Sequence, residues 1–186
     1  MSKTEKEIRL KINKNDIEMI KKITKCFKKR ERMIDITCGK YGFDSLKKLG
    51  YIGRIRYSSE YLKIEIKKYE NKNQALEKSI KINSIKDGLE FFELLDMYPY
   101  LVLDRYREIR KFNDLLIFID EFETIGSYLE IEYENKLDAI EFINMIGIEC
   151  IEQEKYGDIY KNKIDNDPKF EKNVSIELDK LKNKHK

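Results

Sequence analysis

Residues 4–12 read TEKEIRLKI, and taking every second residue separates this stretch into two kinds of side chain. The apolar set is Ile8, Leu10 and Ile12. The charged set is Glu5, Glu7, Arg9 and Lys11. Successive side chains of an extended chain point to opposite faces, so the stretch predicts a strand with one apolar and one charged face. The fold must therefore accommodate carboxylates and cations side by side on one strand.

The same alternation continues in later segments, where every second residue is again charged. The further charged sets are Arg54 and Arg56; Lys63, Glu65 and Lys67; Glu77 and Lys81, with the polar Ser79 between them; Arg105 and Arg107; Asp120; and Glu130, Glu132 and Glu134. For any one segment, a face turned to water explains such a pattern well. However, the acids gather on the first and last segments and the arginine pairs on the middle ones, which favours a shared interior over a mixed soluble surface.

The predicted elements are mainly strands, interrupted by a few amphipathic helices. Strands are expected at 3–12, 32–42, 50–58, 60–69, 74–83, 99–112, 114–122 and 126–134. Helices are expected at 14–28 with Asn15 as the cap, at 87–96, 137–145 and 156–164, and near the C-terminus. Sequential strands with short turns favour antiparallel pairing, and eight such strands can close into a barrel. We therefore predict a mainly β (α+β) fold, an eight-stranded antiparallel closed barrel with helices packed outside.

Composition limits the classes of protein to consider. The chain has 186 residues, of which 41% are hydrophobic and 39% charged, with a net charge of +3. These values indicate a globular protein, with a barrel domain at 1–164 and a charged C-terminal helix or tail at 165–186. The small net charge predicts neither nucleic-acid nor membrane binding. Without an apolar leader segment, the chain is expected to be cytoplasmic, and a homodimer is left open.

Cysteine and histidine usage excludes several kinds of site. Cys26, Cys38 and Cys150 show no CxxC spacing, so neither a disulfide framework nor a zinc site is predicted. The only histidine, His185, lies in a lysine-rich tail. Chemistry in this chain must therefore proceed without a histidine base.

If the predicted sheet closes, the charged groups line one lumen. A lumen with several cations requires an anion, and clustered carboxylates beside it require a divalent metal. Cations and metal-binding carboxylates that converge on one tunnel describe a site for a polyphosphate with Mg²⁺.

Short motifs in a fixed order carry a resemblance to a known family. They are Glu5-Lys6-Glu7-Ile8-Arg9, Arg54-Ile55-Arg56, Lys67 in LKIEIK, Arg105-Tyr106-Arg107, the block from Asp120 to Glu132 that contains Gly126, and Tyr156 in KYGDIY. Over residues 5–160 the chain resembles the CYTH superfamily of triphosphate tunnel metalloenzymes, which includes class IV adenylyl cyclases, thiamine triphosphatases and inorganic triphosphatases. The resemblance likewise implies an eight-stranded closed barrel.

The sequence departs from the family pattern at three places. Arg9 and Arg105 stand where the family has lysine. The segment 75–79 keeps only Glu77 of an Arg-x-Glu-x-Glu strand. Arginine at positions 9 and 105 keeps the positive charge but replaces a compact ammonium group with a planar guanidinium group.

The resemblance, together with the ligand preferences of Mg²⁺ or Mn²⁺, implies a role for each candidate residue. Metal ligands are expected to be Glu5, Glu7, Glu130, Glu132 and Asp120. Phosphate contacts are expected from Arg9, Lys11, Arg54, Arg56, Lys67, Arg105 and Arg107. Catalytic roles are expected for Glu5, Glu7, Arg9, Lys67 and Asp120.

The implied activity is metal-dependent chemistry on the triphosphate of a nucleotide or of a small organic or inorganic compound. A class IV adenylyl cyclase, which converts ATP to cyclic AMP and pyrophosphate, is ranked first. A triphosphatase acting on thiamine triphosphate, tripolyphosphate or a nucleoside triphosphate is the alternative. A degenerate barrel that binds a nucleotide or polyphosphate without turnover is the third reading, and a purely structural barrel is the least favoured, because buried like charges are costly.

Overall fold

The computed structural model describes residues 3–71, 74–151 and 153–184. The strands are β1 Lys3–Ile12, β2 Lys25–Gly39, β3 Tyr51–Tyr57, β4 Leu62–Asn71, β5 Gln74–Lys81, β6 Tyr98–Phe112, β7 Leu115–Phe122 and β8 Gly126–Glu132. The helices are α1 Lys14–Ile23, η1 Gly42–Asp44, α2 Ser45–Leu49, α3 Ile85–Glu93, α4 Lys136–Met145, α5 Tyr156–Asn166 and α6 Pro168–Lys184. The described part of the chain is thus an antiparallel β protein with helices, as predicted, and none of these helices is long and apolar enough to cross a membrane.

The first helix corrects the sequence prediction at both ends. Asn13, not Asn15, is its cap: the Asn13 side chain accepts hydrogen bonds from the Asn15 and Asp16 amides, and the Asp16 carboxylate accepts one from the Asn13 amide. Such a reciprocal capping box satisfies amides that have no partner within the helix. The helix ends at Ile23 rather than at residue 28, and Phe27 lies on β2 with 60% of its surface exposed. The short helices η1 and α2 were not predicted.

The chain forms two compact units. The first unit comprises Met1–Thr4, Met33–Asp104 and Tyr156–Lys186, and the second comprises Glu5–Arg32 and Arg105–Lys155. The predicted division at residue 164 stays a prediction. In the first unit β2, β3, β4 and β5 pair in that order, and in the second unit β6, β7, β8 and β1 do so, always antiparallel. Closure of the eight strands into a barrel stays a prediction.

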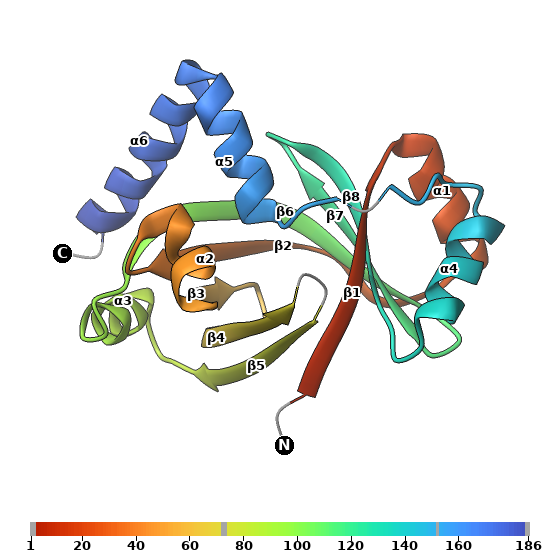
Figure 1. Cartoon of the computed structure of the whole chain (residues 1–186), viewed down its shortest axis with the longest axis horizontal. Coiled ribbons are helices and arrows are strands. Elements are labelled where there is room, and N and C mark those ends of the chain that lie inside the picture. Colours follow the sequence, from red (N-terminus) through yellow and green to blue (C-terminus); the bar gives the residue numbers. More distant parts are fainter. Residues whose placement is uncertain (1–2, 72–73, 152, 185–186) are drawn as a thin grey trace. The chain divides into compact units, whose positions relative to one another are not determined.

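The apolar face of the first unit packs on α3, which lies beside β3 and β4 (Figure 1). Its buried cluster is Ile36, Cys38, Ile55, Ile64, Phe92 and Met97. Gly53 permits the close approach of Phe92, because a Cβ atom at residue 53 would lie 2.3 Å from Phe92 Cε1. Burial raises the pKa of the Cys38 thiol to about 12, so this thiol is a packing group rather than a nucleophile.

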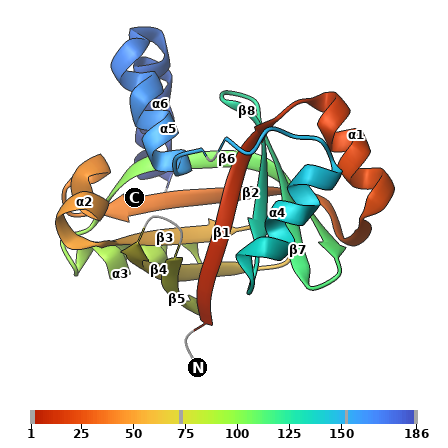
Figure 2. The ribbon, with the colours of Figure 1, turned by 45° about the vertical axis from the view of Figure 1, so that its right-hand side comes forward.

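The helices α5 and α6 lie side by side and belong to the first unit (Figures 1 and 2). The rings of Tyr160 and Phe170 have their centroids 5.5 Å apart, and both side chains are buried. Phe170 of α6 therefore packs on α5.

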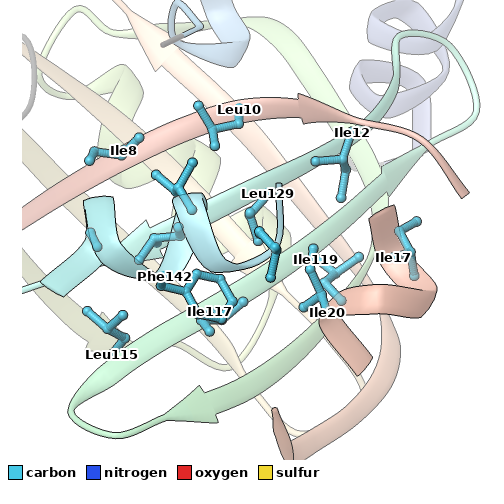
Figure 3. Packing of buried hydrophobic residues seen from close by; sticks show 14 residues of the cluster. Ile8, Leu10, Ile12, Ile17, Ile20, Leu115, Ile117, Ile119, Leu129 and Phe142 are labelled. Atoms are coloured by element: carbon cyan, nitrogen blue, oxygen red, sulfur yellow. The ribbon is translucent and has the colours of Figure 1, made fainter. Parts of the chain in front are cut away.

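The apolar face of the second unit is covered by α1 and α4, which pack on β1, β7 and β8 (Figure 3). The buried cluster is Ile8, Leu10, Ile12, Ile17, Ile20, Leu115, Ile117, Ile119, Leu129, Ile131, Ala139, Phe142, Ile143 and Ile146. The three apolar residues of the opening stretch all belong to it. The charged residues that alternate with them must therefore point to the other side of the sheet.

Arg110 joins the end of α1 to the sheet of the second unit. Its guanidinium donates to the Thr24 hydroxyl at 2.6 Å, to the Thr24 carbonyl at 2.7 Å and to the Lys21 carbonyl at 3.0 Å, and it also pairs with Glu108. A cation is favoured beside the carbonyl groups that end a helix. This buried arginine fixes where α1 stops and β2 begins, which the local sequence pattern does not reveal.

We predict that Phe142→Ala lowers the free energy of unfolding by about 3–5 kcal/mol, because the substitution leaves a cavity at a fully buried site. The Phe142 side chain is 1% exposed, and its ring packs on Phe112 at 5.1 Å. Urea denaturation measures the change. Leu137→Ala is the matched control on the same helix: Leu137 is 65% exposed, and its loss should change stability by less than about 0.5 kcal/mol.

Candidate functional site

Guanidinium and carboxylate groups form two buried networks on the charged faces of the strands, one in each unit. The first network, in the first unit, consists of Asp35, Arg54, Arg56, Lys63, Glu65, Lys67 and Glu77. The second network, in the second unit, consists of Glu7, Arg9, Arg105, Arg107, Asp120 and Glu130. Each network is described by itself below.

Glu65 on β4 is the centre of the first network and is 1% exposed. It lies directly across from Arg54 in the β3–β4 ladder and accepts a hydrogen bond from Arg54 Nε at 2.6 Å. Lys63 also pairs with it, and Arg56 Nη1 lies 3.8 Å from its Oε1 atom. Three cations thus surround one carboxylate on neighbouring strands.

Arg56 on β3 forms a bidentate ion pair with Asp35 of β2. Arg56 Nε donates to one Asp35 oxygen at 2.6 Å and Nη2 donates to the other at 2.9 Å, and Asp35 is 1% exposed. Parallel hydrogen bonds of this kind fix the plane of the guanidinium.

Lys67 and Glu77 lie opposite each other in the β4–β5 ladder, with Nζ and Oε2 3.9 Å apart. Lys67 is buried, and its ammonium lies 5.6 Å from the centre of the Tyr69 ring. The seven side chains of the first network comprise four cations and three carboxylates, and this excess of positive charge suits an anion.

The charges of the first network reinforce one another. Burial raises the pKa of the Glu65 carboxyl, but Arg54, Arg56 and Lys63 outweigh burial and bring this pKa below its usual range. Burial lowers the pKa of Arg54, yet the carboxylates of Glu65 and Asp35 raise it above the usual value. Both signs of charge are therefore maintained in a buried setting at neutral pH.

Asp120 on β7 organises the second network and is fully buried. Its two oxygens accept from Arg107 Nε at 2.6 Å and from Arg107 Nη2 at 2.5 Å, and Arg105 Nε lies 3.4 Å away. Arg107 Nη2 also reaches Glu130 at 3.3 Å. The register explains these contacts, because Arg107 lies directly across from Asp120 in the β6–β7 ladder.

Aromatic rings support the arginines of the second network. Arg107 lies over the Phe118 ring at 4.7 Å, and Arg105 lies over the Phe122 ring at 5.7 Å. Phe118 and Phe122 alternate with the apolar residues that face the helices, so they share the charged face with Asp120. Contacts between a guanidinium and a ring strengthen when they are shielded from water.

Arg9 on β1 bridges two acids of the second network. Its Nη2 atom lies 3.0 Å from Glu7 and 2.8 Å from Glu130, and its Nη1 atom donates to the Glu154 carbonyl at 3.1 Å. Glu130 is directly opposite Arg9 in the β1–β8 ladder, and Glu132 is directly opposite Glu7. Two of the predicted metal ligands therefore converge on one positively charged group.

The remaining predicted residues are placed as follows. Glu5 lies outside the residues whose side chains the structure describes. Lys11 is exposed near the end of β1, and its phosphate contact stays a prediction. Glu132 is half-buried on the same face as Glu130. Tyr156 is buried at the start of α5 in the first unit.

The donor set fits a hard divalent cation only in part. Within the described residues, no group of three or more acidic, cysteine or histidine side chains gathers as a complete metal site. The pair Glu7 and Glu130 nevertheless already converges on a cation, the Arg9 guanidinium. Mg²⁺ is commonly held by one or two carboxylates, water and substrate phosphates. Such a site is completed by the substrate rather than by the protein.

The three acids of the first network, Asp35, Glu65 and Glu77, were all missed as site residues by the sequence analysis. Glu65 was placed on the charged face but given no role. Asp35 was not considered, although Asp35 and Thr37 alternate with Ile34 and Ile36 in the same way as the other charged sets. Applying the alternation test to β2 finds Asp35, whereas its pairing with Arg56 follows only from the β2–β3 register.

Comparison with known proteins identifies relatives of the fold. No family model and no curated protein matches the chain. A protein from Pyrococcus horikoshii OT3 has a TM-score of 0.73 at 20% identity, over 86% of this chain and 99% of the other. A "putative adenylate cyclase" from Bacillus halodurans gives 0.60 at 13% identity, over 83% and 96%. A "putative adenylyl cyclase" from Hippeastrum, described as having a dominant triphosphatase activity, gives 0.58 at 13% identity, over 84% and 93%. At 20% identity or less, these matches show a likeness of fold alone.

We predict that Glu65→Gln lowers the free energy of unfolding by about 3–5 kcal/mol near pH 7, because it breaks a buried ion-pair network. The folded-state pKa of Glu65 is below the ordinary value of 4.5, so its contribution is complete above that pH and is lost as the pH falls further. The difference in the free energy of unfolding between Glu65→Gln and wild type should therefore decrease when urea unfolding is repeated at successively lower pH below 4.5. Glu70→Gln, an exposed site on the same strand, is the control. A difference that stays constant with pH contradicts this assignment.

Proposed function

We propose that this chain is a metal-dependent enzyme that acts on the triphosphate of a nucleotide or of a small organic or inorganic compound. The single observation that carries the proposal is the pair of buried networks, in which arginines and lysines alternate with carboxylates on adjacent strands. Taking this many charges out of water is costly, and a protein with no use for them is more stable with apolar residues there. The folds of the proteins compared above support the same class.

The cations of both networks are suited to hold phosphate oxygens. Glu65 and Asp35 fix the orientation of the planar guanidinium groups of Arg54 and Arg56. Lys67 adds an ammonium group on the neighbouring strand β4. Guanidinium groups bind phosphate through parallel hydrogen bonds. Asp120 acts as an orienting acid for Arg107, whose guanidinium would stabilise charge that develops on the phosphates.

The carboxylates of the second network would hold Mg²⁺ or Mn²⁺, with Glu7 and Glu130 as principal ligands and Glu132 and Glu5 as further candidates. When bound, the metal supplies neutralisation of phosphate charge and activation of a nucleophile. The site residues themselves keep the phosphates in place and, because they are buried, keep bulk water away from them.

The nucleophile decides between two reactions. Attack by the ribose 3′-hydroxyl on the α-phosphorus releases pyrophosphate and forms cyclic AMP. Attack by water on the terminal phosphorus releases orthophosphate. We propose the class IV adenylyl cyclase reaction first, with the triphosphatase as the alternative.

We infer that the eight strands close into the barrel that the family resemblance implies. What supports closure is that β2 and β6 each continue from one unit into the other. A closed sheet also leaves no strand edge unpaired.

The activity is tested by incubating the protein with MgCl₂ or MnCl₂ and ATP, tripolyphosphate or thiamine triphosphate, with products followed by phosphorus NMR. Cyclic AMP with pyrophosphate identifies the cyclase, and orthophosphate identifies the triphosphatase. Thermal stabilisation by these compounds without product identifies a binding barrel. Neither product nor stabilisation with any of them overturns the proposal.

We predict that Lys67→Gln raises KM for the triphosphate about 10- to 100-fold, because one charge-assisted hydrogen bond contributes roughly 1.5–3 kcal/mol. Steady-state kinetics measures the effect. Lys68→Gln is the matched control: it removes the same charge from the next residue of β4, whose side chain is exposed. An equal change of KM in both variants would show that overall charge, not contact, matters.

We predict that Glu130→Gln lowers kcat about 100-fold or more at saturating metal, because Glu130 belongs to the metal-binding pair. Glu123→Gln, in the exposed turn between β7 and β8, should keep wild-type rates. Turnover unaffected by Glu130→Gln would argue against a metal-binding role for Glu130.

A further inference from the structure

Arg9 occupies the position where the proposed metal ligands converge. One nitrogen, Nη2, contacts both Glu7 at 3.0 Å and Glu130 at 2.8 Å. All three residues are buried, each with 8% or less of its surface exposed. The same nitrogen therefore pairs with two carboxylates that are largely shielded from water.

The backbone fixes this arrangement. Glu7 and Arg9 lie on one face of β1, and Glu130 is directly across from Arg9 on β8. The segment after α4 holds the other end of the guanidinium: Arg9 Nη1 donates to the Glu154 carbonyl, and the Gln153 amide donates to the Arg9 carbonyl at 2.7 Å. Arg9 is thus held between two strands and a loop, all within the second unit.

We propose that Arg9 is a built-in counter-ion that a divalent cation must displace from Glu7 and Glu130, so that metal binding releases Arg9 toward the triphosphate. This inference rests on the proposed metal-dependent function. It goes beyond that function because it couples two events. Arg9 leaves Glu7 and Glu130 when a metal ion binds them, and Arg9 then becomes available to bind phosphate.

Arg9 and a metal ion that used the same two carboxylate oxygens, Glu7 Oε1 and Glu130 Oε2, would exclude each other. Mg²⁺ binds carboxylate oxygens at about 2.0–2.1 Å, and Arg9 Nη2 already lies 2.8 Å from one of these oxygens and 3.0 Å from the other. A metal ion between the same oxygens would contact the guanidinium and be repelled by its charge.

Competition of this kind couples the metal to the substrate. A triphosphate that attracts Arg9 away from the carboxylates raises their affinity for metal, and by linkage the metal raises affinity for the triphosphate by the same factor. An arginine suits this role better than a lysine, because its fork reaches Glu7, Glu130 and the Glu154 carbonyl together, whereas an ammonium is a single point charge. The family resemblance places lysine at this position, so the device would be particular to chains with arginine here.

The test measures Mn²⁺ affinity without any triphosphate, by calorimetry and by loss of the free-ion electron paramagnetic resonance signal. Arg9→Gln removes the competing charge and should bind Mn²⁺ about 10-fold more tightly than wild type or better. Arg9→Lys keeps the charge but loses the contact with Glu154, so its affinity should lie between the two. Lys6→Gln is the matched control, because Lys6 is an exposed cation on the same strand, next to Glu7. Its affinity should stay within about twofold of wild type.

Each outcome decides the inference. If Arg9→Gln folds only after Mn²⁺ is added, as circular dichroism would show, the exchange is supported. If Arg9→Gln stays unfolded, the Mn²⁺ affinity of Arg9→Lys is used instead. The inference is overturned if Arg9→Lys binds Mn²⁺ as tightly as wild type does, or more weakly. The inference is also overturned if Arg9→Gln and Lys6→Gln tighten binding equally, or if neither wild type nor variant binds Mn²⁺. Tighter Mn²⁺ binding by Arg9→Gln, together with no turnover of any triphosphate by the wild-type protein, would sustain the exchange and refute the proposed enzyme.

Discussion

The pairing of arginine with carboxylate on the buried polar faces of the strands is the constraint on which the rest of this structure depends. A charge removed from water is tolerated only when opposite charges and hydrogen bonds compensate for the lost hydration. In the first unit Glu65 and Asp35 provide this compensation, and in the second unit Asp120 and Glu130 do so. Each pair is formed across a strand ladder, so the register of the sheet and the pairing of the charges cannot change independently.

The opposite faces of the same strands account for the placement of the helices. Ile55 lies between the two arginines of β3 and packs on α3, and Ile8 and Leu10 of β1 pack in the cluster formed with α1 and α4. Asp35 and Glu130, which orient guanidinium groups, are each followed by an isoleucine of these buried clusters, Ile36 and Ile131, and Asp120 is preceded by Ile119. This alternation holds each charged side chain more rigidly than a loop could. Recognition of phosphate by a guanidinium group requires such a fixed orientation.

Under the proposed function, ligand binding would be an exchange rather than a simple addition. The arginines already have protein carboxylates as partners, so a phosphate would compete for Arg54 or Arg107, and a metal would compete for Glu7 and Glu130. Competition of this kind would lower the affinity for phosphate alone and for metal alone, and would favour binding of the two together. The reason is that phosphate pairs with the arginines that the metal displaces, and the metal pairs with the carboxylates that the phosphate leaves without arginine. The excess of one cation in the first network is consistent with an anionic ligand there.

Alternation in the sequence determined most of the strands and the division of charged from apolar faces, because side chains of an extended chain alternate whatever the tertiary context. It also brought Arg54, Arg56, Arg107, Asp120 and Glu130 into the candidate site. It did not locate the end of the first helix, since Arg110, which binds the carbonyls of Lys21 and Thr24, is distant in sequence from both. Nor did it show that Asp35 holds Arg56 or that Arg9 joins Glu7 to Glu130. Those contacts depend on which residues of different strands lie opposite each other, and only the tertiary structure decides that, because register is set by the packing of the apolar faces as a whole.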